Sequence, residues 1–213
     1  MGKAKFSNFI LLDHTLIKKD ITVLRDVNTQ SETFRSTVRR ISSFLAVEIS
    51  KELKVTKLKV RSPLELTTGY ELAQQVVLVP VLRAGLGMVG GFLDIISDAK
   101  VGHIGLQRDE DTLKPKQYYY KTPKNLKSSI VILLDPMLAT GGSSSQAITN
   151  LKIRGSKKCM FACIVASPEG LNRMKKDHAD VKIFGTALDK GLNERGYILP
   201  GLGDAGDRTF GTL

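Results

Sequence analysis

A run rich in glycine and hydroxyl side chains follows Asp135 and reads DPMLATGGS, residues 135–143. Gly141 and Gly142 allow the backbone to approach an anion closely, and Thr140 and Ser143 supply hydroxyl donors. A helix that starts here would add free N–H groups and the positive end of its dipole. The run therefore predicts a phosphate loop, although an ordinary strand-to-helix loop explains it equally well. It is not a P-loop, because no lysine follows the glycines.

Two charged side chains sit where they could complete such a site. Asp135 would repel a phosphate, so it makes sense there only if it accepts hydrogen bonds from sugar hydroxyls or meets a cation. Arg83 ends an apolar run and precedes a glycine-rich turn. Its planar guanidinium suits a phosphate or diphosphate, which it can bind with two parallel hydrogen bonds.

The segment after Arg83 reads GLGMVG and matches the dinucleotide pattern GxGxxG. Asp109 follows at about the spacing of a ribose-binding acid. However, Arg83 and Ala84 separate the glycines from the strand, and Asp109 falls in a polar segment. The pattern is a weak signal, and a dinucleotide-dependent oxidoreductase stays an alternative.

The last chemically suggestive segment, residues 197–208, reads YILPGLGDAGDR. Its glycines, two acids and one arginine can wrap tightly around a small flat ligand. A disordered C-terminal tail is the alternative for this composition.

Alternating strands and helices must position these segments. Long apolar runs predict buried strands, and capping residues and apolar spacing predict helices. The expected strands are residues 76–82, 129–135, 158–167 and 181–189, and the expected helices cover 29–53, 86–96, 143–152 and a segment starting at Ser167 and Pro168. Residues 103–107 and 117–121 flank a polar tip, which predicts a protruding β-hairpin arm at about 103–121.

The first helix shows the pattern most clearly. Thr29 and Glu32 fit a capping box, and an apolar face recurs at three- and four-residue spacing through Phe34, Val38, Ile41, Leu45 and Ile49. The alternation as a whole predicts an α/β fold with a mostly parallel twisted sheet flanked by helices. Ligands of such sheets bind beyond the C-terminal strand ends. We therefore expect the site at the loops after Leu82, Leu134 and Ala166 and in the last loop.

Composition excludes several classes of protein. The 213 residues are 42% hydrophobic and 25% charged, as in a soluble globular protein. No apolar run approaches a membrane span of about 18 residues, and no signal peptide is evident. Cys159 and Cys163 lack partners at metal-ligand spacing, so we expect no zinc site and a cytoplasmic location. Scattered histidines and the absence of GxSxG and HExxH disfavour serine hydrolase and zinc protease chemistry.

The net charge of +11 raises the question of nucleic acid. The 21 lysines and 11 arginines are spread along the chain and are not interleaved with aromatic residues, and tryptophan is absent. We therefore expect a solvated basic surface or a composition bias of the genome, without a nucleic-acid partner.

Taken together, DPMLATGGS, LRAGLGM, RDEDTLKPKQYYYK and YILPGLGDAGDR resemble the type I phosphoribosyltransferases, and among them the uracil phosphoribosyltransferase family. The resemblance runs from about Phe6 to the C-terminus. Pro136 replaces the second acid of the wider superfamily, as in the uracil enzymes. The resemblance implies one phosphoribosyltransferase domain over residues 1–213, with the arm at 103–121 and a base-binding loop at about 191–213.

The resemblance also assigns roles to residues. The phosphate loop would bind phosphoribosyl diphosphate (PRPP), with Asp135 on the ribose hydroxyls, Arg83 and Arg108 on the diphosphate, and Asp204 also reaching PRPP. The full expected PRPP set is Arg83, Arg108, Asp135, Pro136, Met137, Leu138, Ala139, Thr140, Gly141, Gly142, Ser143 and Asp204. The residues expected to recognise uracil are Ile198, Gly203, Asp204 and Ala205. The residues expected to be catalytic are Asp135, Arg83, Arg108 and Asp204.

The implied reaction joins uracil to PRPP and gives UMP and diphosphate, a step of pyrimidine salvage. Mg²⁺ would be carried by PRPP, with no metal site on the protein itself, and the tip of the arm would act as a lid. A homodimer or higher homo-oligomer is expected, and GTP activation as an allosteric purine effector stays open. A nucleotide-binding regulator on the same fold, touching RNA through its lysines, is the second alternative.

Overall fold

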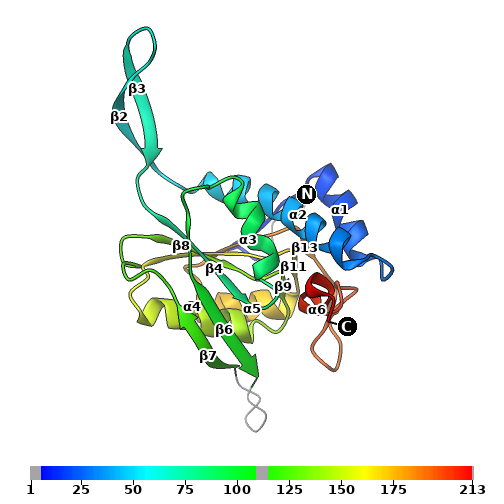
Figure 1. Ribbon diagram of the computed structural model, residues 1–213. Coiled ribbons are helices and arrows are strands. Elements are labelled where there is room, and N and C mark those ends of the chain that lie inside the picture. Colours follow the sequence, from blue (N-terminus) through cyan, green and yellow to red (C-terminus); the bar gives the residue numbers. More distant parts are fainter. Residues whose placement is uncertain (1–5, 109–114, 213) are drawn as a thin grey trace.

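The computed structural model describes residues 6–108 and 115–212, without the side chains of Arg108 and Pro115. Over this range the centre is an eight-stranded sheet (Figure 1). Its strands, in spatial order, are β1 (Phe9–Leu11), β12 (Lys182–Gly185), β10 (Lys158–Ala162), β8 (Ile130–Leu134), β4 (Val76–Leu82), β6 (His103–Arg108) and β7 (Pro115–Lys121), with β5 (Lys100–Val101) beside β4. Neighbours are parallel except for β6 and β7. The predicted mostly parallel sheet and the β-hairpin arm are both confirmed.

Helices cover both faces of the sheet because strand side chains point alternately to each side. In β4, Val76 and Leu78 pack into one core with Phe34 and Phe92, while Val77 faces a second core on the other side. The first core lies under α1 (Thr15–Arg25), α2 (Ser31–Ser50) and α3 (Leu86–Leu93), and the second lies under α4 (Gly142–Ile153) and α5 (Pro168–Asp177) (Figure 1). The expected α/β layering is therefore confirmed.

The helix α2 buries the apolar face that the sequence predicts, but it starts differently. The face consists of Phe34, Val38, Ile41, Leu45 and Ile49. The predicted capping box is wrong: the helix starts at Ser31 after Gln30. The hydroxyl of Thr29 instead donates to the carbonyl oxygen of Val23 (2.7 Å), so it serves the preceding turn. Among the described residues, no helix combines the length and the hydropathy needed to cross a membrane.

Three of the predicted strands end early, and each is followed by a second, shorter strand. The structure adds a short parallel sheet of β9 (Met137–Leu138), β11 (Val165–Ala166) and β13 (Ala187–Leu188), beyond β8, β10 and β12. The carbonyl oxygen of Pro136 accepts the N–H groups of both Ile164 and Val165 (3.0 Å each), which joins the first two of these short strands. The second sheet thus brings three chain segments side by side at the C-terminal edge, where the sequence places the site.

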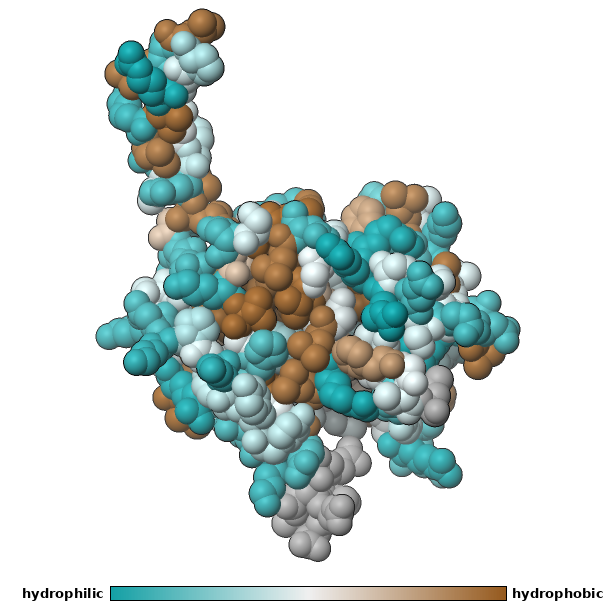
Figure 2. All heavy atoms as spheres, viewed as in Figure 1, coloured by the Kyte–Doolittle hydropathy of each residue, from teal (hydrophilic) through white to brown (hydrophobic). Residues whose placement is uncertain are grey.

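A second hairpin was not predicted. Strands β2 (Val55–Arg61) and β3 (Leu66–Leu72) pair antiparallel and extend far from the body (Figure 1). Apolar side chains on it are exposed, above all Leu64 at 96% and Leu66 and Tyr70 at 62% each, and apolar and polar residues mix along its length (Figure 2). The sequence signal was a Ser62–Pro63 turn between runs of valine, threonine and leucine.

Candidate active site

A cavity of about 240 Å³ lies at the C-terminal edge of the sheet. Three loops contribute to its lining, which consists of Ala84, Asp135, Met137, Ala139, Gly196, Tyr197, Ile198, Gly203, Asp204, Ala205 and Gly206. The fold thus brings predicted residues of the phosphate loop together with all four residues expected to recognise the base. Four lining residues were not among the expected site residues. Ala84, Tyr197 and Gly206 lie within the quoted motifs, and Gly196 precedes the last of them.

Asp135 lies directly after β8 and is half-buried. Its Oδ1 accepts the backbone N–H of Met137 (3.2 Å). Burial raises the pKa of Asp135 to about 7, against the opposing effect of that hydrogen bond. Near neutral pH this carboxyl therefore exchanges between a neutral form and a charged acceptor. A ligand that donates hydroxyl hydrogens to it favours the charged form.

The phosphate loop has the backbone that an anion site needs. Gly141 has φ +75° and is the N-cap of α4. A Cβ there would lie 3.0 Å from the carbonyl oxygen of Gly170. The first turn of α4 contains no acidic residue, so nothing there opposes the positive end of the helix dipole. Thr140 and Ser143 are exposed beside this turn, as a hydroxyl donor to a ligand must be.

The helix α5 braces both ends of the phosphate loop. Ser167 caps α5 by accepting the N–H of Gly170 (2.9 Å), which confirms the predicted helix start, and its hydroxyl donates to the carbonyl oxygen of Ala139 (2.6 Å). On the far side, Ser145 donates to Asp177 (2.7 Å). Because Ala139 and Ser145 flank the glycines, these bonds fix the loop relative to α5.

The C-terminal loop, residues 196–206, is built into the fold. It includes β15 (Ile198–Leu199), which pairs with β14 (Gly191–Leu192), and it leads into α6 (Ala205–Phe210). Asp204 caps α6 by accepting the N–H of Asp207 (2.9 Å). Gly203 has φ +70°, a conformation that glycine adopts readily. The alternative of a disordered tail is therefore wrong for the described residues.

One of the two expected diphosphate ligands lies apart from this lining. Arg83 follows β4 and does not line the cavity. Its guanidinium donates to Asp207 (2.7 Å) and to the hydroxyl of Thr212 (3.3 Å). Thr212 and Arg83 together hold the pKa of Asp207 below its ordinary value. Arg108 ends β6, and its side chain lies outside the described part. The arm tip with Asp109, expected as a lid, also lies outside it, at residues 109–114.

The other expected loop residues have a supporting place. Pro136 and Leu138 are buried beneath the loop rather than in the cavity wall. Residues 140–143 continue from Ala139 at the cavity edge into α4. Their backbone, rather than their side chains alone, is what an anion would meet.

The glycines of GLGMVG serve packing instead of a ligand loop. Most of the segment lies inside α3, with Gly85 as its N-cap. A Cβ at Gly85 would lie 2.3 Å from the carbonyl oxygen of Leu134. One at Gly87 would lie 3.2 Å from Cγ2 of Thr209, and one at Gly90 would lie 3.3 Å from Nε of Arg39. The dinucleotide alternative therefore loses the glycine loop on which it depended.

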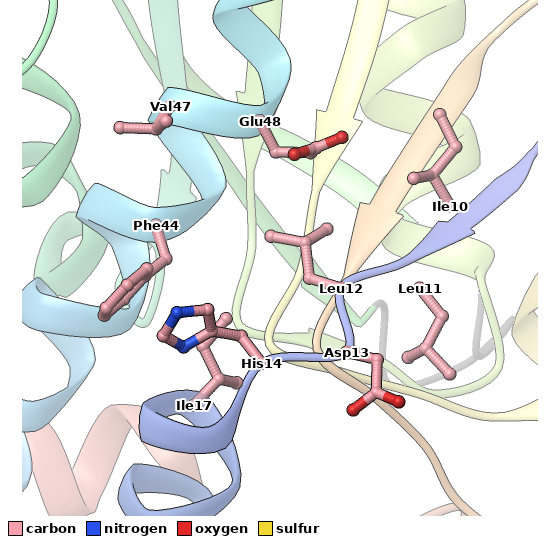
Figure 3. A pocket seen from close by; sticks show the side chains of 9 residues that line it. All are labelled: Ile10, Leu11, Leu12, Asp13, His14, Ile17, Phe44, Val47 and Glu48. Atoms are coloured by element: carbon pink, nitrogen blue, oxygen red, sulfur yellow. The ribbon is translucent and has the colours of Figure 1, made fainter.

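Volume alone would point to a different cavity. A larger one, of about 430 Å³, lies between β1, α1 and α2. Figure 3 shows the ring of His14 beside that of Phe44, with Asp13 and Glu48 at the same cavity. None of the described motif residues lines it, so we assign the site from its chemistry. Within residues 6–108 and 115–212, no group of three His, Cys, Asp or Glu could hold a metal ion.

Comparison with known proteins places this geometry in a family. The profile of the family described as uracil phosphoribosyltransferase matches residues 11–212. The uracil phosphoribosyltransferase of Acholeplasma laidlawii is 50% identical over the full length of both chains. That of Bacillus velezensis is 48% identical over 95% of this chain and 97% of its own.

Solved structures agree on the fold. The AQ2163 protein from Aquifex aeolicus superposes with a TM-score of 0.90 at 37% identity, over 95% of this chain and 97% of its own. A hypoxanthine-guanine phosphoribosyltransferase from Bacillus anthracis gives 0.50 at 11% identity, over 74% of this chain and 80% of its own, which shows the shared fold alone. The chain belongs to the uracil phosphoribosyltransferase family.

Proposed function

We propose that this protein transfers the 5-phosphoribosyl group of PRPP to N1 of uracil and releases UMP and diphosphate, a step of pyrimidine salvage. The observation that carries the proposal is that Asp135 and the phosphate loop line the same cavity as the C-terminal loop. A phosphate cradle and a small flat binding surface on one cavity fit a reaction between a sugar phosphate and a free base.

In this proposal, residues 139–143 bind the 5′-phosphate of PRPP and Asp135 accepts hydrogen bonds from the ribose hydroxyls. Gly141 at the start of α4 and the exposed hydroxyls of Thr140 and Ser143 support the first role. The position of Asp135 supports the second, because its half-buried carboxyl lines the cavity and hydroxyl donors would stabilise its charged form.

The diphosphate meets Arg83 and Arg108 in the same proposal. Arg83 now pairs with Asp207, but its side chain is 55% exposed. An exposed pair of this kind is worth at most about 1 kcal/mol, so the guanidinium can turn to a diphosphate at low cost. As C1 separates from the diphosphate, negative charge grows on the leaving group, and the arginines stabilise it electrostatically.

Mg²⁺ arrives with PRPP in this scheme. The site offers two carboxylates, Asp135 and Asp204, on one cavity. Such a sparse oxygen set fits an ion that keeps several waters and takes its other ligands from substrate phosphates. When bound, Mg²⁺ reduces the negative charge of the leaving diphosphate.

The base lies against Ile198, Gly203, Asp204 and Ala205. The C1–O bond breaks with its electron pair going to the diphosphate, the C1–N1 bond forms, and the N1 proton of uracil leaves with the diphosphate. The 5′-phosphate cradle holds the sugar while C1 moves toward N1, which is an orientation effect. Water must be kept out of the site during this step, since it would hydrolyse PRPP.

The wider setting is part of the same proposal. The exposed apolar side chains of the β2–β3 hairpin support a homodimer or higher homo-oligomer. Two free, buried cysteines fit a reducing compartment, and we place the enzyme in the cytoplasm as one domain. Activation by GTP stays open, and we assign no nucleic-acid partner.

The test is an assay of UMP formation from uracil and PRPP, with and without Mg²⁺. We expect Mg²⁺-dependent UMP and an equal amount of diphosphate. Hypoxanthine serves as the competing base, and formation of IMP in preference to UMP would contradict the assignment of the base.

A further inference from the structure

An ion pair outside the cavity connects the end of α1 with the residue that follows β13. Arg25 at the end of α1 binds both carboxylate oxygens of Asp189, at 2.6 and 3.0 Å. The side chain of Asp189 is 6% exposed and that of Arg25 is 26% exposed. A pair with this geometry and burial is costly to disrupt, because either charge would be left without its partner.

The pair also forms hydrogen bonds with both backbone groups of Gly201. The N–H of Gly201 donates to Asp189 (2.9 Å), and its carbonyl oxygen accepts from Arg25 (3.2 Å). Gly201 has φ +62°, and a Cβ there would lie 2.2 Å from the carbonyl oxygen of Ile198. The backbone between Ile198 and Gly203 is therefore fixed by polar contacts and tight packing.

A second arginine fixes the next residue from the same side. Arg208 is almost fully buried and donates to the carbonyl oxygen of Leu202 (2.9 Å). It also donates to the carbonyl oxygens of Leu24 and Asp26, at the end of α1. The C-terminal loop is thus tied to the end of α1 at two successive residues.

We propose that Arg25 and Asp189 are positioning residues that set base specificity, by holding the backbone of the C-terminal loop in one conformation. The inference rests on the proposed function. A backbone N–H is always a donor and a C=O always an acceptor. A fixed backbone therefore rejects a base with the opposite pattern, whereas a loose loop can rearrange to accept it.

The experiment compares Arg25→Ala with Arg25→Lys and with the double variant Arg25→Ala/Asp189→Asn. Arg25→Ala alone leaves the carboxylate of Asp189 buried and unpaired, and the double variant removes that charge. The double variant therefore tests the Arg25–Asp189 pair, called the brace below, even where Arg25→Ala does not fold. Arg39→Ala is the matched control, because Arg39 also binds both oxygens of one carboxylate, Asp94, at an exposed place away from the cavity.

We expect Arg25→Ala and the double variant to lower kcat/KM for uracil by about 10- to 100-fold, as small misplacements do. The uracil-to-cytosine ratio of kcat/KM should fall by about tenfold. The KM for PRPP should stay within about twofold, since the phosphate loop has its own brace. Arg25→Lys should retain part of the specificity, and Arg39→Ala should match the wild type.

Amide hydrogen exchange over residues 198–205 provides a readout that does not depend on catalysis. Exchange in this segment should accelerate in Arg25→Ala or the double variant and stay unchanged in Arg39→Ala. The inference would be overturned if Arg25→Ala or the double variant folds and leaves both the exchange rate and the uracil-to-cytosine ratio of kcat/KM unchanged. An equal rise in KM for uracil and for PRPP would also overturn it. Absence of UMP formation by the wild type, with accelerated exchange in the variants, would overturn the proposed function while leaving the brace established.

Discussion

The phosphate loop is held by elements that neighbour it along the chain, whereas the C-terminal loop is held by the end of α1, more than 160 residues away. Ala139 and Ser145 are fixed by α5, the next helix but one after β8. Gly201 and Leu202 are fixed by Arg25 and by Arg208, which is itself tied to α1.

The difference matches what each loop has to do. A phosphate offers the same oxygens in every nucleotide, so a glycine turn at a helix start is enough to bind it. A base must be told from other bases of similar size, and that requires donors and acceptors that cannot move. We infer that the local loop supplies binding and the remotely braced loop supplies selection.

The largest effect is expected where the phosphate loop meets the ribose. Asp135→Asn keeps the shape of the side chain but turns one acceptor into a donor. We expect turnover to fall by at least about 100-fold, as for the loss of one preorganised catalytic group. A kcat near that of the wild type would exclude the ribose role.

Stability provides the control for this variant. Burial raises the folded-state pKa of Asp135 to about 7, so its ionised form becomes progressively unfavourable for folding as pH rises from about 4 to 7. At pH 8, Asp135→Asn should therefore unfold at the same temperature as the wild type or at a higher one. A lower Tm would mean that the lost activity reflects damage to the fold.

A smaller effect is expected at the diphosphate. Arg83→Lys keeps the charge but loses the planar fork. We expect kcat to fall by about tenfold, because the leaving-group charge grows toward the transition state. Steady-state kinetics separate this from a simple binding role, in which KM for PRPP would rise while kcat stayed the same.

The turn of the phosphate loop can be tested with a matched pair of glycines. Gly141→Ala and Gly155→Ala each force alanine into a left-handed conformation, at φ +75° and +99°, at a cost of about 1–2 kcal/mol. A Cβ at 141 also meets Gly170, whereas one at 155 meets nothing within 4 Å. Only Gly141→Ala should raise KM for PRPP, by several-fold. An equal rise in both variants would mean that KM merely follows stability.

The smallest effect is a dependence on pH. As pH rises from 6 to 8 through the pKa of about 7, Asp135 ionises and KM for PRPP should fall, by about two- to threefold. The 5′-phosphate of PRPP titrates near pH 6 as well. The same profile measured on Asp135→Asn isolates the substrate's share, and identical profiles would rule out Asp135 as the titrating group.

The two loops also differ in how far the sequence predicts them. Strands 76–82 and 129–135, the α2 face and the turn at Gly141 follow local rules of periodicity and capping, and these predictions hold. The ties from Arg25 and Arg208 depend on the fold bringing chain ends together, and no local pattern marks them. The β2–β3 hairpin was missed because its apolar residues are exposed, so burial patterning did not reveal it. The roles of Arg83 and Arg108 stay predictions.

The most direct test of selection by a fixed backbone is the ratio of kcat/KM for uracil to that for cytosine, measured with PRPP and Mg²⁺. Uracil presents an acceptor at O4 and a donor at N3, and cytosine inverts both. Backbone groups that pair with uracil would therefore meet donor against donor and acceptor against acceptor. We expect a ratio of about 10⁴ or more, with 5-fluorouracil used nearly as well as uracil because its polar edge is the same. Cytosine within tenfold of uracil would contradict the account.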